Sequence, residues 1–285
     1  MASFFIKLLN LILYSNLWIA LAAVATTAQT FLLLKDKIDQ PNFLIFVCAS
    51  TLFIYAVHRI VGLQKVKPFQ SKGRYLVIST FKSHIIIYAI VAGITAFVCF
   101  WKLQRAVQLS LVVPSVVALA YVLPMLAGKK RLRDIHFVKI FLVAIVWAWV
   151  GVILPVLQIE QNLDASVWWM VAERALFIFA ITLPFDIRDL KIDEHANVQT
   201  IPAKIGVQRS KRLAFLALVG TLICSYQNVM LGTYSSLNWW ALALSAASTG
   251  ILIFFSDRKM HDYYFTALLD GTIIFQFLLV VLLEI

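Results

Sequence analysis

The stretch FDIRDLKIDEHANVQTIPAKIG, residues 185–206, follows directly on an apolar segment at 167–185. It contains three carboxylates, Asp186, Asp189 and Asp193, spaced by three and four residues. If the apolar segment is a helix that continues through them, all three lie on one face. Because like charges repel, such a face needs a counter-ion. The stretch therefore predicts either a site for a hard cation such as Mg²⁺ or an acidic surface neutralised by neighbouring basic residues.

The composition of the whole chain gives the class of protein. It is 62% hydrophobic and 14% charged, whereas a soluble domain has about 45–50% apolar and about 25% charged residues. With only 10 Gly and 7 Pro, the chain is neither collagen-like nor disordered. The class that remains is an all-α integral membrane protein with several spanning helices.

Nine segments have the length, about 20 mostly apolar residues, that a helix needs to cross a bilayer. They lie at 8–34, 42–60, 84–101, 107–127, 136–157, 167–185, 212–232, 237–255 and 265–284. We predict nine transmembrane helices that form a single domain over residues 1–285.

The net charge of +11 is distributed unevenly over the predicted loops. If the N-terminus is cytoplasmic, twenty Lys and Arg residues fall inside and only four, Lys35, Lys37, Lys102 and Arg105, fall outside. Positive charge concentrates on the cytoplasmic side of membrane proteins, so we predict a cytoplasmic N-terminus in an inner or plasma membrane. The longer loops share that side, so we expect the chemistry at the cytoplasmic rim and no nucleic-acid partner.

The stretch 185–206 resembles the second aspartate-rich motif of the UbiA-type membrane prenyltransferases, most closely in their naphthoate-prenylating branch. Arg188, Asp189 and Asp193 match the charged core of that motif, and Asp186 stands where the branch has Asn. Asn197 stands where Gly is common, and Asn tolerates a left-handed backbone better than most residues.

A second patch closes the fourth predicted span. Tyr121, Pro124 and the basic run Lys129, Lys130 and Arg131 look like the Tyr-Pro and Lys-Arg signature of the same family. The resemblance implies a bundle of nine helices that transfers a prenyl group from a polyprenyl diphosphate to an aromatic or other small acceptor.

The resemblance also implies roles for particular side chains. Asp186, Asp189 and Asp193 would hold Mg²⁺, one ion rather than two being an option. The candidates for binding the diphosphate are Arg59, Lys72, Lys129, Lys130 and Arg131, and those for lining the pocket are Tyr55, His58 and Tyr121. Metal and basic side chains would stabilise the charge that grows on the leaving diphosphate.

The first aspartate-rich motif of the family is missing. Tyr55, Arg59 and Leu63 occupy the spacing where Asn, Asp and Asp are expected, and residues 41–100 contain no Asp or Glu. Either Arg59 replaces a metal ion and meets the diphosphate, or it forms a structural salt bridge with Asp186 or Asp189. The first alternative predicts an enzyme. The second predicts a non-catalytic descendant that binds isoprenoid or lipid or supports a membrane complex.

Three further ionisable residues lie inside predicted spans: Glu173 and Arg174 in the sixth and Asp270 in the ninth. Such groups indicate a polar pocket or relay, or else pairing between helices.

Overall fold

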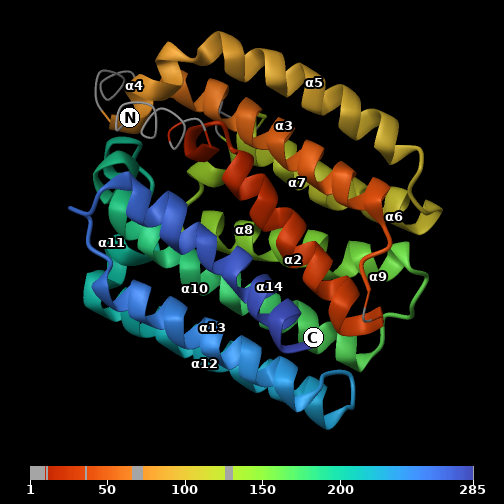
Figure 1. The fold of residues 1–285 in the computed structure, drawn as a ribbon. Helices are drawn as coiled ribbons and strands as arrows, with labels where there is room; N and C mark the ends of the chain where they lie inside the picture. The colour runs from red at the N-terminus through yellow and green to blue at the C-terminus, as the bar shows by residue number, and fades with distance from the viewer. Residues whose placement is uncertain (1–9, 11, 36, 66–72, 126–130, 285) are drawn as a thin grey trace, which may run out of the picture.

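A computed structural model describes residues 10, 12–35, 37–65, 73–125 and 131–284, and every regular element in them is a helix (Figure 1). The elements are α2 (Leu17–Lys35), α3 (Pro41–Lys65), α4 (Gly73–Thr80), α5 (Lys82–Phe100), α6 (Arg105–Ser110), α7 (Val112–Val122), η3 (Leu132–Asp134), α8 (Val138–Ala148), η4 (Trp149–Ile153), α9 (Leu154–Gln158), α10 (Ala165–His195), α11 (Ile201–Ile205), α12 (Val207–Met230), α13 (Ser236–Phe255), η5 (Tyr264–Leu269) and α14 (Asp270–Glu284).

Within these described ranges, eight helices or runs of consecutive helices are long and apolar enough to cross a membrane. They coincide with eight of the nine predicted spans. The remaining span, 167–185, lies inside α10, whose apolar part carries Glu173 and Arg174 and whose last turns are charged. The all-α membrane fold is confirmed, whereas the count of nine and the side of the N-terminus stay predictions.

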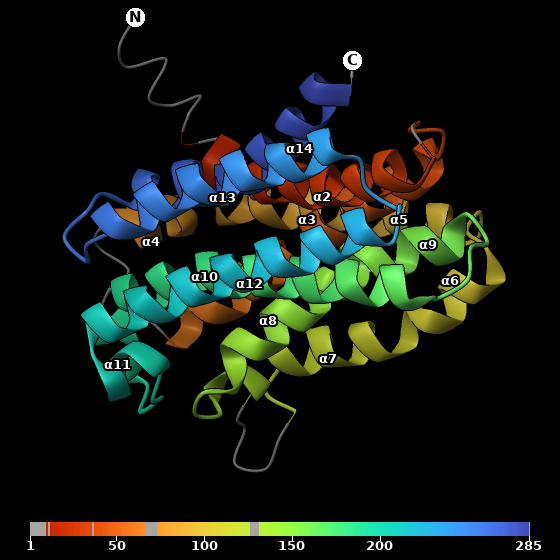
Figure 2. The ribbon, with the colours of Figure 1, turned by 90° about the horizontal axis from the view of Figure 1, so that it is seen from below.

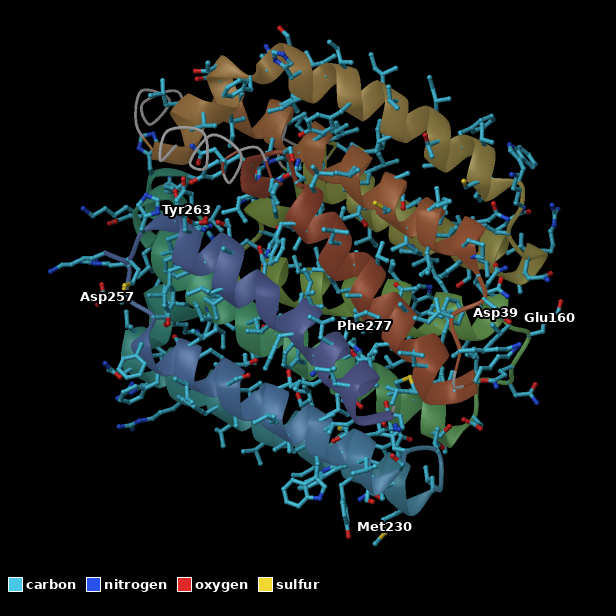
Figure 3. All side chains as sticks on the ribbon, in the orientation of Figure 1. Asp39, Glu160, Met230, Asp257, Tyr263 and Phe277 are labelled. Atoms are coloured by element: carbon cyan, nitrogen blue, oxygen red, sulfur yellow. The ribbon has the colours of Figure 1, made fainter. Side chains whose placement is uncertain are left out.

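The helices pack in a closed sequence of neighbours around the bundle. Helix α2 packs on α3, α3 on α7, α7 on α8, α8 on α10, α10 on α12, α12 on α13, α13 on α14, and α14 returns to α2. In the view from below, α8, α10 and α12 run side by side (Figure 2). Figure 3 marks the two ends, with Asp39 and Glu160 at one and Asp257 and Tyr263 at the other. A cavity at one end can therefore be walled by segments that are distant in sequence.

Small residues allow the innermost helix to approach its neighbours closely. Helix α2 buries a face of Ala and Thr, and the Thr30 hydroxyl donates to the Gly151 carbonyl at 2.6 Å. A Cβ added at Gly151 would lie 3.2 Å from the Thr26 side chain. Between helices in lipid, such close packing replaces the hydrophobic driving force available in water.

The acidic stretch continues the sixth predicted span as a helix. Helix α10 runs without interruption to His195 and includes Pro184, so the expected face of three aspartates is formed. Asn197 then adopts φ +53°, a left-handed backbone that Asn tolerates better than most residues. The Val198 N–H donates to the Asp193 carbonyl at 2.8 Å, and this turn directs the chain into α11.

Candidate functional site

A cavity of about 330 Å³ lies at the end of the bundle that carries α4 and α11. Its walls are formed by residues 13–16, the start of α2, α3, α7, α8, α10 and the start of α14, among other residues. Eight predicted site residues line it together: Tyr55, His58, Arg59, Tyr121, Arg131, Asp186, Asp189 and Asp193. The other three, Lys72, Lys129 and Lys130, lie outside the described residues.

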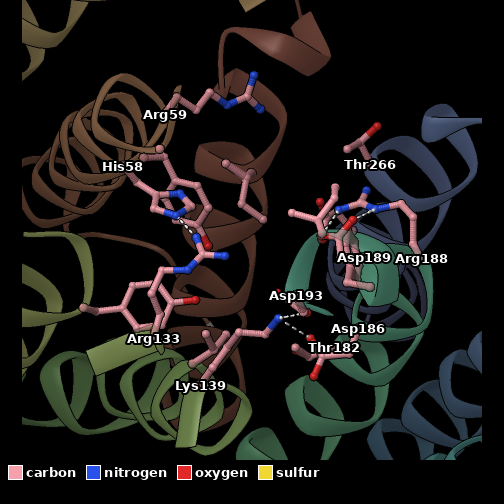
Figure 4. A pocket seen from close by; sticks show the side chains of 18 of the residues that line it. His58, Arg59, Arg133, Lys139, Thr182, Asp186, Arg188, Asp189, Asp193 and Thr266 are labelled. Atoms are coloured by element: carbon pink, nitrogen blue, oxygen red, sulfur yellow. Dashed lines mark hydrogen bonds and ion pairs between the residues drawn. The ribbon is translucent and has the colours of Figure 1, made fainter. Parts of the chain in front are cut away.

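Two of the three aspartates share one lysine. Lys139, in the first turn of α8, places its Nζ 2.8 Å from Oδ1 of Asp186 and 2.8 Å from Oδ2 of Asp193. All three side chains are buried, with Lys139 8%, Asp186 2% and Asp193 6% exposed. The ammonium therefore lies between the two carboxylates at the position a bridging cation would take (Figure 4).

The third aspartate is held by its neighbour along the helix. Arg188 donates from Nε to Oδ1 of Asp189 at 2.9 Å and from Nη2 to Oδ2 at 3.0 Å. The guanidinium also packs over the rings of Phe185 and Phe265, at 4.9 and 5.1 Å from their centroids. It forms a further ion pair with Asp262 at 3.4 Å. The geometry of Asp189 is thus fixed by a two-point contact.

A basic wall faces this acidic helix across the cavity, and Figure 4 shows His58, Arg59 and Arg133 on that side. The Arg133 guanidinium contacts Nε2 of His58 and lies over the Tyr121 ring, 5.6 Å from its centroid. Burial acts to lower the pKa of Arg133, but the Tyr121 hydroxyl and nearby carboxylates outweigh it and raise that pKa above its ordinary value. Arg133 therefore brings a permanent positive charge to the cavity.

Arg59 lines the cavity. The sequence alone did not decide whether this side chain faces the pocket. Its guanidinium donates to the carbonyl oxygens of Tyr14 and Leu13, the latter at 3.4 Å, and lies 6.0 Å from the centroid of the Tyr14 ring. These contacts join the C-terminal part of α3 to the segment before α2.

Arg131 is oriented by a carboxylate from its own loop. Its Nη2 lies 2.8 Å from Oδ1 of Asp134, and its Nε donates to both carboxylate oxygens at 3.2 and 3.1 Å. The side chain is buried and lines the cavity. Its role as a diphosphate ligand stays a prediction.

The donors in this arrangement do not fit a resident divalent ion. Mg²⁺ requires oxygen ligands in near-octahedral geometry at about 2.0–2.1 Å. Here Asp186 and Asp193 are bridged by Lys139, and Arg188 engages both oxygens of Asp189. In the part of the chain that the structure describes, no group of three or more His, Cys, Asp or Glu side chains is assembled for a metal.

The other ionisable residues of the spans divide into two kinds. Glu173 accepts from the Tyr234 hydroxyl, in the turn before α13, at 2.9 Å, and Arg174 donates to Gln276 of α14 at 2.8 Å, so both pair with neighbouring segments away from the cavity. Asp270 instead lines the cavity.

Sequence reasoning missed three basic residues of the site, Lys139, Arg133 and Arg188, as ligand candidates. A basic residue near the start of an apolar segment, as Lys139 is in 136–157, is the signal that could have identified the most important of them.

Solved structures that resemble this chain share its fold at low sequence identity. A UbiA homologue from Archaeoglobus fulgidus bound to GPP and Mg²⁺ is 11% identical with a TM-score of 0.66, over 95% of this chain and 99% of that chain. A digeranylgeranylglyceryl phosphate synthase is 12% identical with a TM-score of 0.61, over 96% and 95%. The apo UbiA homologue from Aeropyrum pernix K1 is 16% identical with a TM-score of 0.55, over 95% and 93%. No curated protein matches the chain by sequence.

The sequence pattern of the UbiA prenyltransferase family matches residues 72–267, which is more than half of the chain. The match includes α10 with its aspartates, the start of α8 with Lys139, and the segments before α8 and after α10 that contact each other. With its long apolar helices, this integral membrane protein therefore belongs to the UbiA prenyltransferase family.

Proposed function

We propose that this protein is a membrane prenyltransferase that binds a polyprenyl diphosphate in the cavity and transfers the prenyl group to a small acceptor. The observation that carries the proposal is the cavity itself, where Arg59 and Arg133 face an acidic helix and apolar side chains continue the walls into the bundle. Related folds hold GPP and Mg²⁺ or DMAPP and Mg²⁺, which supports an isoprenoid diphosphate as the substrate class.

The basic wall is the proposed site of the diphosphate. Arginine forks match phosphate oxygens in two-point contacts, and Arg59 and Arg133 lie on one side of the cavity. Arg131, and Lys72, Lys129 and Lys130 outside the described residues, are proposed to add charge around the same position.

The apolar walls are the proposed site of the prenyl chain. Trp18, Trp147, Ile178, Ile181 and Ile273 line the cavity toward the interior of the bundle. Tyr55 lies among the same lining residues, where its ring offers an aromatic face.

In the proposed reaction, the allylic C–O bond to the diphosphate breaks and the electron pair leaves with the diphosphate. Arg59 and Arg133 stabilise this growing negative charge. The acceptor then forms a bond to the allylic carbon and loses a proton, and we assign Asp270, a carboxylate in the cavity wall, as the recipient of that proton.

We place the cavity on the cytoplasmic side of an inner or plasma membrane. The cavity lies at the end of the bundle where α3, α7 and α10 end. The segments predicted to connect spans on the inside, 61–83, 128–136 and 186–211, carry 14 of the 25 Lys and Arg residues. The distribution of twenty inside against four outside supports this orientation.

The test is binding of non-hydrolysable farnesyl thiodiphosphate to the protein purified in detergent, followed by diphosphate release from farnesyl diphosphate with a panel of aromatic acids. Saturable binding that farnesol does not displace, together with acceptor-dependent release, supports the enzyme. Absence of binding contradicts the proposal.

A second function, a non-catalytic binder of isoprenoid or lipid, is favoured by one observation. Lys139 neutralises two of the aspartates, and the expected first acidic motif is replaced by Tyr55, Arg59 and Leu63. Binding of the thiodiphosphate without release of diphosphate for any acceptor would favour this function.

A further inference from the structure

The Lys139 bridge is held in place by contacts outside the cavity. The Phe137 N–H donates to the Gln199 carbonyl at 3.0 Å, and the Gln199 N–H donates to Nδ1 of His136 at 2.8 Å. These bonds tie the start of α8 to the turn that follows α10. Lys139 follows one of these joined segments, and its partners Asp186 and Asp193 precede the other. The two hydrogen bonds therefore hold the ammonium in position beside the two carboxylates.

The ammonium and a divalent ion cannot use the two carboxylates together. Nζ of Lys139 lies 2.8 Å from an oxygen of each, so an ion bridging Asp186 and Asp193 would occupy the same volume. A second positive charge there would also repel the first. The site accepts one of the two cations, and the chain itself supplies one.

The charges that line the cavity already balance among the described residues. Five basic side chains and five carboxylates contribute to the lining. They are Arg59, Arg131, Arg133, Lys139 and Arg188 on one hand, and Asp134, Asp186, Asp189, Asp193 and Asp270 on the other. An acidic site needs metal ions to accept a diphosphate, whereas a site whose carboxylates are already balanced by arginine and lysine side chains does not.

We infer that Lys139 is a resident cation that takes the place of a divalent ion, so that this protein binds an isoprenoid diphosphate without Mg²⁺. That the ligand is an isoprenoid diphosphate rests on the proposed function. That Lys139 takes the place of a divalent ion rests on its contacts with Asp186 and Asp193. Removing the ammonium should leave two buried carboxylates facing each other, which are hard ligands for a divalent ion.

The experiment has two arms on the full chain in detergent. The first measures the Kd of farnesyl thiodiphosphate in EDTA and in Mg²⁺. The second measures binding of Mn²⁺ alone by electron paramagnetic resonance. Both compare wild type with Lys139→Met, and Lys191→Met on the exposed side of α10 is the matched control. Lys139→Gln, which removes the charge, keeps a polar group beside the two carboxylates and leaves both of them in place, replaces Lys139→Met if that variant does not fold, and the same results are expected of it.

In wild type we expect Kd values in EDTA and Mg²⁺ to agree within about twofold, with no bound Mn²⁺. Lys139→Met should bind Mn²⁺, and its affinity for the thiodiphosphate should fall by about tenfold in EDTA and recover in Mg²⁺. Wild-type binding that requires Mg²⁺, or Mn²⁺ binding to wild type that Asp193→Asn removes, would overturn the inference. If no variant binds the thiodiphosphate, the proposed function fails, and the Mn²⁺ arm still decides the role of Lys139.

Discussion

Helix α10 carries two sets of buried charges that are thirteen residues apart and are partnered differently. Glu173 and Arg174 are each about 1% exposed, with partners Tyr234 and Gln276 on neighbouring segments. Asp186 and Asp193 are also buried, but their partner Lys139 forms part of a cavity wall.

The difference separates charges that serve the fold from charges that serve a ligand. Both sets lie in a membrane protein, where an unpaired charge is costly. The first set is closed off from the cavity, so its loss should affect stability alone. The second set shares a cavity with Arg59, Arg133 and Asp270, so its changes should affect binding and chemistry.

The largest effect is expected from breaking the buried pair of Glu173 and Arg174. Arg174→Met removes the cation beside Glu173, 3.7 Å away, and leaves that carboxylate buried with only the Tyr234 hydroxyl as a hydrogen-bond donor among the described residues. We expect a loss of about 3–5 kcal/mol in the free energy of unfolding, measured by denaturant titration in detergent.

The control for this prediction is the double variant Glu173→Gln/Arg174→Met. It removes both charges, so it should recover part of the lost stability. Binding of farnesyl thiodiphosphate to the folded fraction should stay at the wild-type level. An Arg174→Met protein as stable as wild type would contradict the structural role of this pair.

Much of the fold was predictable because its signal is local. The segment predicted at 237–255 is the helix Ser236–Phe255, since an apolar run of that length has one stable form in a bilayer. The common face of Asp186, Asp189 and Asp193 followed from their spacing. Asn197, at a position where Gly is common in the family that the stretch resembles, adopts a left-handed backbone, which Asn tolerates.

The partners of the charges could not be predicted, because they depend on packing between segments distant in sequence. Lys139 is 54 residues from Asp193, and only the contact of α8 with α10 brings them together. Arg59 donates to carbonyl oxygens 45 and 46 residues away. The split of 136–157 into α8, η4 and α9 was not predicted either, although Pro155, which has no N–H to donate to the Gly151 carbonyl, lies at it.

The charges that line the cavity can be tested next at Asp270, the proposed proton acceptor. Asp270→Asn keeps the shape of the side chain and removes its ability to accept a proton. We expect the rate of prenyl transfer to fall by about 10²-fold, the lower range for loss of a general base, while the Kd of farnesyl thiodiphosphate is unchanged. Asp257→Asn, at an exposed position near the end of α13, is the control. An equal loss of binding and rate would instead indicate a role in substrate affinity.

A smaller effect is expected at the basic wall. Arg133→Gln removes a permanent charge and a two-point donor, so the Kd of farnesyl thiodiphosphate should rise by about tenfold. Arg209→Gln, at an exposed position on α12, provides the comparison and should bind as wild type does. Unchanged binding in Arg133→Gln would move the diphosphate away from this wall.

The smallest effect is expected at the turn between the two halves of the site. Asn197 has φ +53°, a backbone that Gly adopts freely and a β-branched residue adopts at a cost. Asn197→Val should therefore lower the free energy of unfolding by about 1–2 kcal/mol, whereas Asn197→Gly should change it little. The same turn carries Gln199, which bonds to His136 and Phe137 before Lys139. If this turn positions the ammonium, Asn197→Val should also gain weak Mn²⁺ binding that Asn197→Gly lacks, because a displaced Lys139 exposes its two carboxylates to the ion.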